Sequence, residues 1–300
     1  MDSLVERIQS LKKAKNAIIL AHNYTNPEIQ DVADMVGDSL GLSKKASKTD
    51  ADVIVFCGVT FMGETAKILS PNKHVLLPNP EAKCDMAEMC SPEALRAKKA
   101  EYPDAVVVGY VNSTGPTKGE MDVCCTSGNA VQVVRSLKEK KILFAPDRNL
   151  GRYVAEKNPD KEVILWNGCC PIHDNSTLEE EQALKAAHPN AVSMAHPECK
   201  KAILDKMDFI GSTEAMLKQA MASDAKEFIV LTEVGMQHRM EKECPGKRFW
   251  FPGSAVCKAM KAMTLEDIVR CLENMDGEIE LSDEVIEAAK LPVTRMTEIA

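Results

Sequence analysis

The sequence predicts an α/β fold, in which three homologous three-layer αβα domains with parallel sheets have a pseudo-threefold arrangement around a central active site. Two observations carry this prediction. Short apolar runs alternate with helical patterns along the chain, which is typical of parallel βαβ units. In addition, Cys84 precedes Cys170 by 86 residues and Cys257 follows it by 87 residues. This interval is far longer than a solenoid repeat, so it indicates a domain that occurs three times.

The repeat can be followed from element to element. Each unit begins with a helical pattern, at residues 3–15, 91–100 and 177–187. A first strand then ends on a polar side chain, at 17–22 with His22, 105–110 with Tyr110 and 191–196 with His196. A second strand is predicted at 53–57, 142–145 and 228–232. A third strand, at 74–78, 163–166 and 248–252, leads to the repeated cysteine, and we expect the run 163–166 to be buried.

These elements predict three domains of nearly equal length, at residues 1–87, 88–174 and 175–261. The remaining residues, 262–300, contain one further helical pattern, Leu265–Asn274, which no further repeat follows. We expect this tail to pack back on the first domain.

The composition excludes several classes of protein. Apolar residues make up 45% of the chain and charged residues 27%, which is typical of a globular protein. A net charge of −8 argues against general binding to nucleic acid or to an anionic membrane. No apolar run reaches the roughly 18 residues of a membrane span, and residues 1–15 have the pattern of a surface helix rather than a signal peptide. We therefore expect a cytoplasmic protein, whose eleven cysteines are free thiols or metal ligands.

The three repeated cysteines form the main candidate site. Three thiolates that meet at one centre are expected to bind a soft metal or an iron–sulfur cluster and to leave one coordination position vacant. Two simpler interpretations stay open: three buried free cysteines, or a structural zinc site of three cysteines with His173. The other cysteines lack the repeat register, and we expect core or surface thiols at Cys57, Cys90, Cys124, Cys125, Cys169, Cys199, Cys244 and Cys271, with Cys169 a neighbour of the metal.

Polar residues recur in two further sets. The first set lies at the strand ends: His22, Tyr110 and His196 are followed two residues later by Tyr24, Asn112 and Glu198. Tyr24 and Glu198 are candidates for an acid and a base. Three stretches, 37–39, 126–128 and 211–213, resemble helix starts rich in hydroxyl groups and small residues. Helix starts aimed at one centre would suit a substrate with several negative charges.

Together these residues resemble the quinolinate synthase family. The resemblance covers nearly the whole chain in the family's order, and it is carried by Ala21-His22-Asn23-Tyr24, Val36-Gly37-Asp38-Ser39, Tyr110-Val111-Asn112-Ser113, Cys125-Thr126-Ser127, Pro146-Asp147-Arg148-Asn149-Leu150-Gly151, Asn167-Gly168-Cys169-Cys170-Pro171-Ile172-His173, Ala195-His196-Pro197-Glu198-Cys199, Gly211-Ser212-Thr213, Thr232-Glu233-Val234-Gly235-Met236 and Ala255-Val256-Cys257.

The resemblance implies an enzyme of NAD biosynthesis that condenses iminoaspartate with dihydroxyacetone phosphate to quinolinate, phosphate and two waters. It implies a 4Fe-4S cluster whose ligands are Cys84, Cys170 and Cys257 and whose fourth iron is an open Lewis acid. Tyr24, Glu198 and His196 are then expected to be catalytic, the first two in proton transfer. The substrate pocket is expected to include His22, Ser39, Tyr110, Asn112, Ser127, His173, His196, Glu198, Ser212 and Thr213.

Two positions depart from the pattern of the family. Many relatives have histidine where Cys169 stands and proline where Asp85 stands, but the repeat register and the following Pro171-Ile172-His173 favour Cys170 as the ligand. The expected partners are the two small substrates and, transiently, the enzyme that supplies iminoaspartate, without nucleic acid or membrane. The alternatives are another 4Fe-4S hydro-lyase acting on a hydroxy-carboxylate, an iron–sulfur electron carrier or sensor, and a zinc-stabilised binding module.

Overall fold

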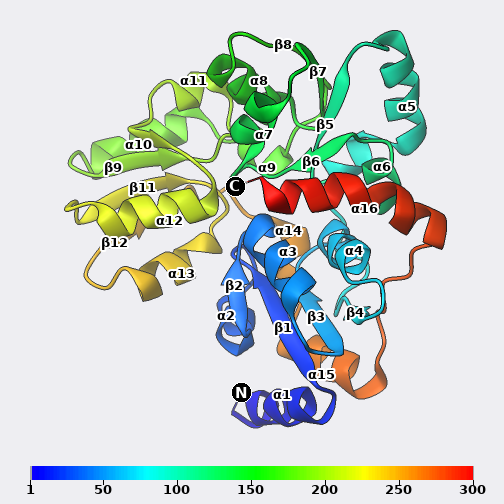
Figure 1. Ribbon diagram of the computed structural model, residues 1–300. Coiled ribbons are helices and arrows are strands. Elements are labelled where there is room, and N and C mark those ends of the chain that lie inside the picture. The colour runs from blue at the N-terminus through cyan, green and yellow to red at the C-terminus, as the bar shows by residue number, and fades with distance from the viewer. Residues whose placement is uncertain (1, 300) are drawn as a thin grey trace.

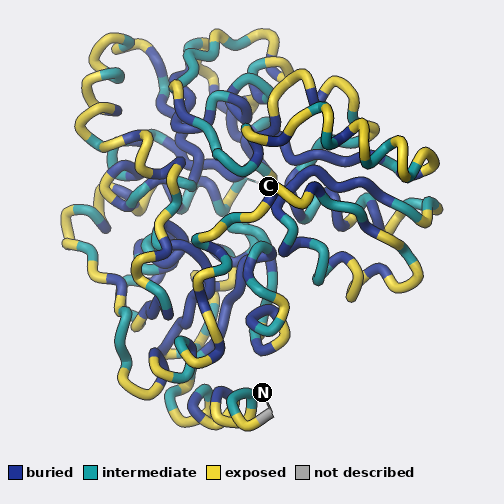
Figure 2. Tube along the Cα trace, turned by 180° about the vertical axis from the view of Figure 1, so that it is seen from behind, coloured by how far each residue is buried: buried dark blue, intermediate teal, exposed yellow. Residues whose placement is uncertain are grey.

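The computed structural model describes residues 2–299 and consists of three four-stranded parallel sheets with flanking helices (Figure 1). The carboxyl ends of the strands in all three sheets face the middle of the molecule. In Figure 2 the buried segments gather around that middle, whereas the outer helices carry most of the exposed residues. The α/β fold with three domains, predicted from the sequence, is confirmed. No helix among the described residues is long and apolar enough to cross a membrane.

All three sheets have one strand order, in which the first strand in sequence lies between the second and the third. The first sheet contains β1 (Ala17–His22), β2 (Met35–Gly37), β3 (Val53–Cys57) and β4 (His74–Leu76). The second contains β5 (Val106–Tyr110), β6 (Val123–Cys125), β7 (Lys141–Ala145) and β8 (Glu162–Leu165). The third contains β9 (Val192–Ala195), β10 (Phe209–Ile210), β11 (Glu227–Leu231) and β12 (Arg248–Trp250).

The helices follow the same division. The first unit has α1 (Asp2–Ala14), α2 (Pro27–Val32), α3 (Ser39–Lys48), α4 (Thr60–Leu69) and the 3₁₀ turn η1 (Ala87–Met89). The second has α5 (Pro92–Glu101), α6 (Gly115–Lys118), α7 (Ala130–Ser136), α8 (Arg148–Lys157) and α9 (Pro171–Asp174). The third has α10 (Leu178–Ala187), α11 (Lys201–Leu204), α12 (Thr213–Ala222), α13 (Met236–Glu243) and α14 (Lys258–Lys261), and the tail adds α15 (Leu265–Asn274) and α16 (Asp283–Glu298).

Strand pairing repeats residue by residue. The first and second strands of each sheet pair residues 15 positions apart, namely Leu20 with Met35, Val108 with Val123 and Met194 with Phe209. In each unit the carboxylate of one aspartate accepts a backbone N–H of the first strand at 2.7–2.8 Å: Asp34 accepts from Ile19, Asp122 from Val107 and Asp208 from Ser193. Equal registers place equivalent residues at equivalent points of each sheet, which is what brings the repeated site residues together.

Some elements differ from the prediction. The strands β2, β6 and β10 were not predicted, because edge strands of two or three residues are too short to show a period of two. The run predicted as a buried strand at 163–166 is wrong in its burial, since β8 lies at the edge of its sheet and is only half-buried. Helix α16 was also not predicted, and it carries Pro292 in its interior.

The tail contacts two units. Helix α15 packs against α1 of the first unit, and α16 packs against α3 and α4 of the first unit and against α6 and β6 of the second. One continuous apolar core therefore runs through the first unit, the second unit and α16, whereas the third unit has separate apolar clusters of its own. The boundaries proposed at residues 87, 174 and 261 stay a prediction.

Candidate active site

A cavity of about 490 Å³ lies at the carboxyl ends of the three sheets. Every site residue predicted from the sequence lines it except Ser212: His22, Tyr24, Ser39, Cys84, Tyr110, Asn112, Ser127, Cys170, His173, His196, Glu198, Thr213 and Cys257. Ser212 is buried just behind this lining, where its hydroxyl accepts the N–H of Ala215 at 3.4 Å as the N-cap of α12. Residues from all three units thus share one cavity.

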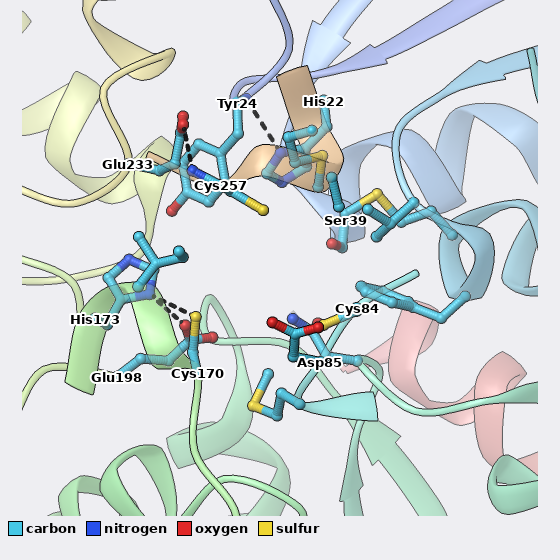
Figure 3. Close-up of a pocket in the computed structure, with 18 of the residues that line it drawn as sticks. His22, Tyr24, Ser39, Cys84, Asp85, Cys170, His173, Glu198, Glu233 and Cys257 are labelled. Carbon is cyan, nitrogen blue, oxygen red and sulfur yellow. Dashed lines mark hydrogen bonds and ion pairs between the residues drawn. The ribbon is translucent and has the colours of Figure 1, made fainter. Parts of the chain in front are cut away.

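The three repeated cysteines occupy one end of the cavity. Figure 3 shows the sulfur atoms of Cys84, Cys170 and Cys257 facing the same space. Each cysteine stands at the start of a short helical turn, because Cys84 precedes η1 closely and Cys170 and Cys257 are the N-caps of α9 and α14. Burial raises the pKa of Cys84 to about 12, and the N–H groups of Ala87 and Met86 act in the opposite direction. Backbone N–H groups beside a sulfur favour its thiolate form and hence metal binding.

In each unit, one polar side chain forms a hydrogen bond to the backbone of the loop that carries the cysteine. Asp147 Oδ2 accepts the N–H of Cys170 at 3.0 Å, and Glu233 Oε1 accepts the N–H of Cys257 at 3.0 Å. In the first unit the equivalent residue is Thr60, whose hydroxyl donates to Ala82 O, two residues before the cysteine, at 3.1 Å. Sequence reasoning did not assign these residues a role, although Asp147 and Glu233 lie 86 positions apart and share the register of the cysteines.

A chain of hydrogen bonds leads from Glu198 across the cavity. Its carboxylate accepts a short hydrogen bond from the Tyr110 hydroxyl and lies 2.7 Å from His173 Nδ1. The other nitrogen of His173 lies 3.0 Å from Thr232 Oγ1, which is 2.7 Å from the Tyr24 hydroxyl. Glu198 and Tyr24 are therefore connected through an imidazole and a hydroxyl, and Thr232 is a member of this chain to which sequence reasoning gave no role.

Burial and neighbouring charges set the protonation of this network. Burial opposes ionisation of Glu198, but the neighbouring His173 and the hydrogen bonds from His173 and Tyr110 outweigh it, so that its pKa is lowered. Burial lowers the pKa of His22 and of His196 to about 3, which leaves both imidazoles neutral at pH 7. Burial also raises the pKa of Tyr24 well above its usual value. At neutral pH the cavity thus holds a carboxylate, two neutral imidazoles and a protonated phenol.

The predicted helix starts occupy another part of the wall. Asp38 is the N-cap of α3 and Ser212 that of α12, whereas the stretch 126–128 ends one residue before Asn129, the N-cap of α7. A methyl group on Gly128 would lie 3.5 Å from Ser212 Oγ and 3.7 Å from Asp38 Oδ2, so the three stretches converge. Asn112 Oδ1 is buried without a hydrogen-bond partner in the described part of the chain, which leaves an acceptor for a ligand in this cavity.

The mouth of the cavity carries charges that sequence reasoning did not assign to the site. Lys83, Asp85 and Lys258 line the cavity and are exposed, and each is next in sequence to one of the three cysteines.

Cys169 does not line the cavity, although it directly precedes Cys170. Its N–H lies 3.5 Å from Met89 Sδ on the outer side of the loop. The structure therefore separates the two adjacent cysteines, with only Cys170 facing the other two.

The donors in the cavity suit a metal centre. One ligand atom each of Cys170, His173 and Glu198 lies within 4.8 Å of the others, and Cys84 and Cys257 line the same cavity. His173 Nδ1 is 3.2 Å from Cys170 Sγ, but both ring nitrogens of His173 already have oxygen neighbours, at Glu198 and Thr232. Three soft sulfur donors, each beside backbone N–H groups, fit a cluster held by three cysteines.

Comparison with known proteins places this arrangement in a family. The profile of the NadA family, described as quinolinate synthetase A protein, matches residues 6–298. The quinolinate synthase of Aquifex aeolicus is 46% identical over 99% of this chain and 94% of its own length. That of Sulfurihydrogenibium sp. is 48% identical over 100% and 99%, and that of Clostridioides difficile is 47% identical over 99% and 98%. The chain belongs to the quinolinate synthetase A family.

Proposed function

We propose that this protein is a quinolinate synthase, which condenses iminoaspartate with dihydroxyacetone phosphate to quinolinate, phosphate and two waters. The observation that carries the proposal is that cysteines from three repeats face one cavity beside the chain from Glu198 to Tyr24. Chain-long similarity to quinolinate synthases supports the same assignment.

We propose Cys84, Cys170 and Cys257 as the ligands of a 4Fe-4S cluster. When bound there, such a cluster supplies a Lewis acid at its fourth iron, which polarises a leaving hydroxyl group. The protein's contribution is to hold three thiolates with backbone N–H groups at the starts of η1, α9 and α14. The loops below them are fixed by Thr60, Asp147 and Glu233.

Proton transfer is assigned to the network beside the cysteines. Glu198 is ionised and accepts a proton, whereas the Tyr24 phenol stays protonated and donates one. His173 and Thr232 connect the two groups, so that a proton lost at one end of the chain is replaced from the other. Loss of two waters and closure of a ring require several such transfers, which suits a network better than a single base.

Substrate binding is assigned to the polar wall. The N-terminus of α12 carries Thr213, and that of α3 carries Ser39, and both residues line the cavity. Free N–H groups at helix starts bind carboxylates, which iminoaspartate carries, and phosphates, which dihydroxyacetone phosphate carries. Ser127 and Asn112 add a hydroxyl and an unpaired amide oxygen from the second unit.

The protein's setting is proposed with its function. All eleven cysteines are free thiols, which suits the reducing cytoplasm that we propose as its location. Iminoaspartate is an imine that water hydrolyses, so we propose transient contact with the enzyme that supplies it.

Anaerobic reconstitution tests the proposal. The protein is expected to bind four irons and four sulfides per chain (the count of a 4Fe-4S cluster), to absorb visible light and to form quinolinate from the two substrates. A protein that contains zinc instead, held by Cys170, His173 and Glu198, would contradict it. A loaded cluster without quinolinate formation, but with dehydration of a hydroxy-carboxylate, would establish the hydro-lyase instead.

A further inference from the structure

Helix α16 packs between the first and second units, and its C-terminal end lies at the centre of the molecule (Figure 1). Its inner face, Ala289, Val293 and Met296, is fully buried in the core that these units share. Gly119, the C-cap of α6, approaches it so closely that an added Cβ would lie 3.0 Å from the Cβ of Ala288. The inner face of α16 is therefore packed closely from Ala288 to Met296.

A single buried side chain joins the end of α16 to the loop 126–128. Asn129 is 1% exposed, and its amide nitrogen donates to Met296 O at 2.9 Å and to Ile299 O at 2.7 Å. Its amide oxygen accepts the N–H of Thr126 at 2.8 Å and the Thr126 hydroxyl at 3.2 Å. Since a carbonyl only accepts and an N–H only donates, these partners fix the orientation of the amide.

The other side of this loop belongs to the cavity. Thr126 and Ser127 line it, and Ser127 Oγ lies 3.0 Å from His196 Nε2 of the third unit. Thr126 Oγ1 also accepts the N–H of Gly128 at 3.2 Å, which closes the turn. A shift of the end of α16 therefore reaches Ser127 through one amide group and one turn.

We infer that Asn129 is a positioning residue and that the end of α16, residues 296–299, is a structural part of the substrate-binding wall. The inference rests on the proposed function, because it assigns the loop 126–127 to substrate binding. Asn129 fixes the loop from behind, and the two carbonyls of α16 fix Asn129. The tail thus belongs to the active site, although among its described residues, 262–299, none lines the cavity.

The variant Asn129→Asp tests this link with almost no change of shape. It keeps an oxygen toward Thr126 but directs an oxygen, in place of two N–H donors, at the carbonyls of Met296 and Ile299. We expect the KM for quinolinate formation to rise about tenfold, the cost of lost buried hydrogen bonds, with kcat within about twofold. The dissociation constant of quinolinate, titrated anaerobically, should rise equally, while iron and sulfide content stay unchanged.

Asn158→Asp is the matched control. Asn158 lies in the same unit, is also 1% exposed, and its amide nitrogen donates to the carbonyls of Val154 at 2.9 Å and Val131 at 3.4 Å. These two partners lie in α7 and α8, and neither belongs to α16 or to the cavity lining. This variant should lower the melting temperature and leave KM and quinolinate binding unchanged. Equal KM values for the two variants would overturn the inference.

A chain that ends at Arg295 tests the other half of the link. Removal of residues 296–300 deletes both acceptor carbonyls together with the buried side chain of Met296, so the shortened chain should show at least the same rise in KM and a lower melting temperature. Asn129→Asp should add nothing further in the shortened chain, whereas multiplying effects would refute the connection. If Asn129→Asp does not fold, Arg295→Gln is tested in its place. It loosens the same end of α16 by removing the hydrogen bond to Asp122 O at 2.7 Å, and we expect it to raise KM without changing kcat.

The parent protein separates this inference from the proposed function. If the reconstituted parent forms no quinolinate, the proposed function fails. If the parent forms quinolinate and Asn129→Asp matches Asn158→Asp, the function stands and the positioning role fails.

Discussion

The cysteine end of the cavity and the strand ends across from it are both built from equivalent positions of the three repeats. Only the cysteine end has the same residue type in every repeat. At the cysteine end, each unit contributes the same side chain, at the start of a short helical turn. Across the cavity, the strand ends contribute His22, Tyr110 and His196, followed by Tyr24, Asn112 and Glu198. Three corners of the proposed cluster are chemically alike and need three like ligands. A substrate without threefold symmetry needs a different group from each unit.

The largest expected effect breaks the uniform end. Cys170→Ala removes one of three like ligands, so we expect loss of most iron and sulfide, loss of visible absorbance and no measurable activity. Anaerobic metal analysis and the absorption spectrum measure this outcome. Cys169→Ala is the matched control, since the adjacent cysteine does not line the cavity, and it should retain iron and at least about half of the activity. The reverse pattern would assign the ligand to Cys169.

The next effect separates the two ends. Glu198→Gln keeps the shape of the side chain but removes the carboxylate that lies 2.7 Å from His173. Loss of a general base should lower kcat by about 10²–10⁴-fold while the cluster spectrum stays unchanged. Steady-state kinetics and the spectrum, measured on one preparation, check this. Loss of the cluster together with activity would show that the two ends are not independent.

A smaller effect is expected at the far end of the same network. Tyr24→Phe removes the hydroxyl that lies 2.7 Å from Thr232, and it should lower kcat by about 10²-fold with iron content unchanged. Tyr102→Phe, which removes a hydroxyl outside the cavity lining, should have parent activity. If Tyr24→Phe reduced activity no more than this control, the phenol would have no role in proton transfer.

The smallest expected effect concerns a support of the cysteine end. Glu233→Gln replaces a fully buried carboxylate that accepts the N–H of Cys257 and pairs with Lys261 at 3.1 Å. The free energy of unfolding should fall by about 1–3 kcal/mol, measured by urea denaturation of the protein without metal. The exposed pair of Lys140 and Asp160 provides the control, because Asp160→Asn should change it by less than about 0.5 kcal/mol. Equal changes would show that Glu233 does not support the loop.

Much of this site could be predicted from the order of residues alone. Cys84, Cys170 and Cys257 are 86 and 87 residues apart, and the strand ends at His22, Tyr110 and His196 are 88 and 86 residues apart. Parallel strands of equal register carry equal spacing into equal positions, so the shared cavity follows from repetition. The tyrosine and glutamate of the network were named because they stand two residues beyond those strand ends.

Other parts left no comparable signal. The edge strands β2, β6 and β10 have two or three residues each, which is too few to show an alternation with a period of two. Helix α16 carries a proline in its interior, which argues against a helix when only local sequence is considered. Asp147 and Glu233 have the register of the cysteines, but an isolated acidic residue after a strand gives no indication that it binds a backbone N–H. Ser212 was expected in the lining and lies just behind it as a helix cap.

The sequence by itself determined the threefold repeat, the three like cysteines and the candidates for acid and base, because a regular spacing along the chain can be recognised without knowledge of the fold. Only the tertiary structure decided which groups meet: Glu198 with His173, Thr232 with Tyr24, and Asn129 with the end of α16. These pairs join residues from different units or from the tail, and their distances depend on how the units pack. The packing of the units depends on complementary surfaces formed by residues far apart in the sequence, so local sequence patterns do not predict it.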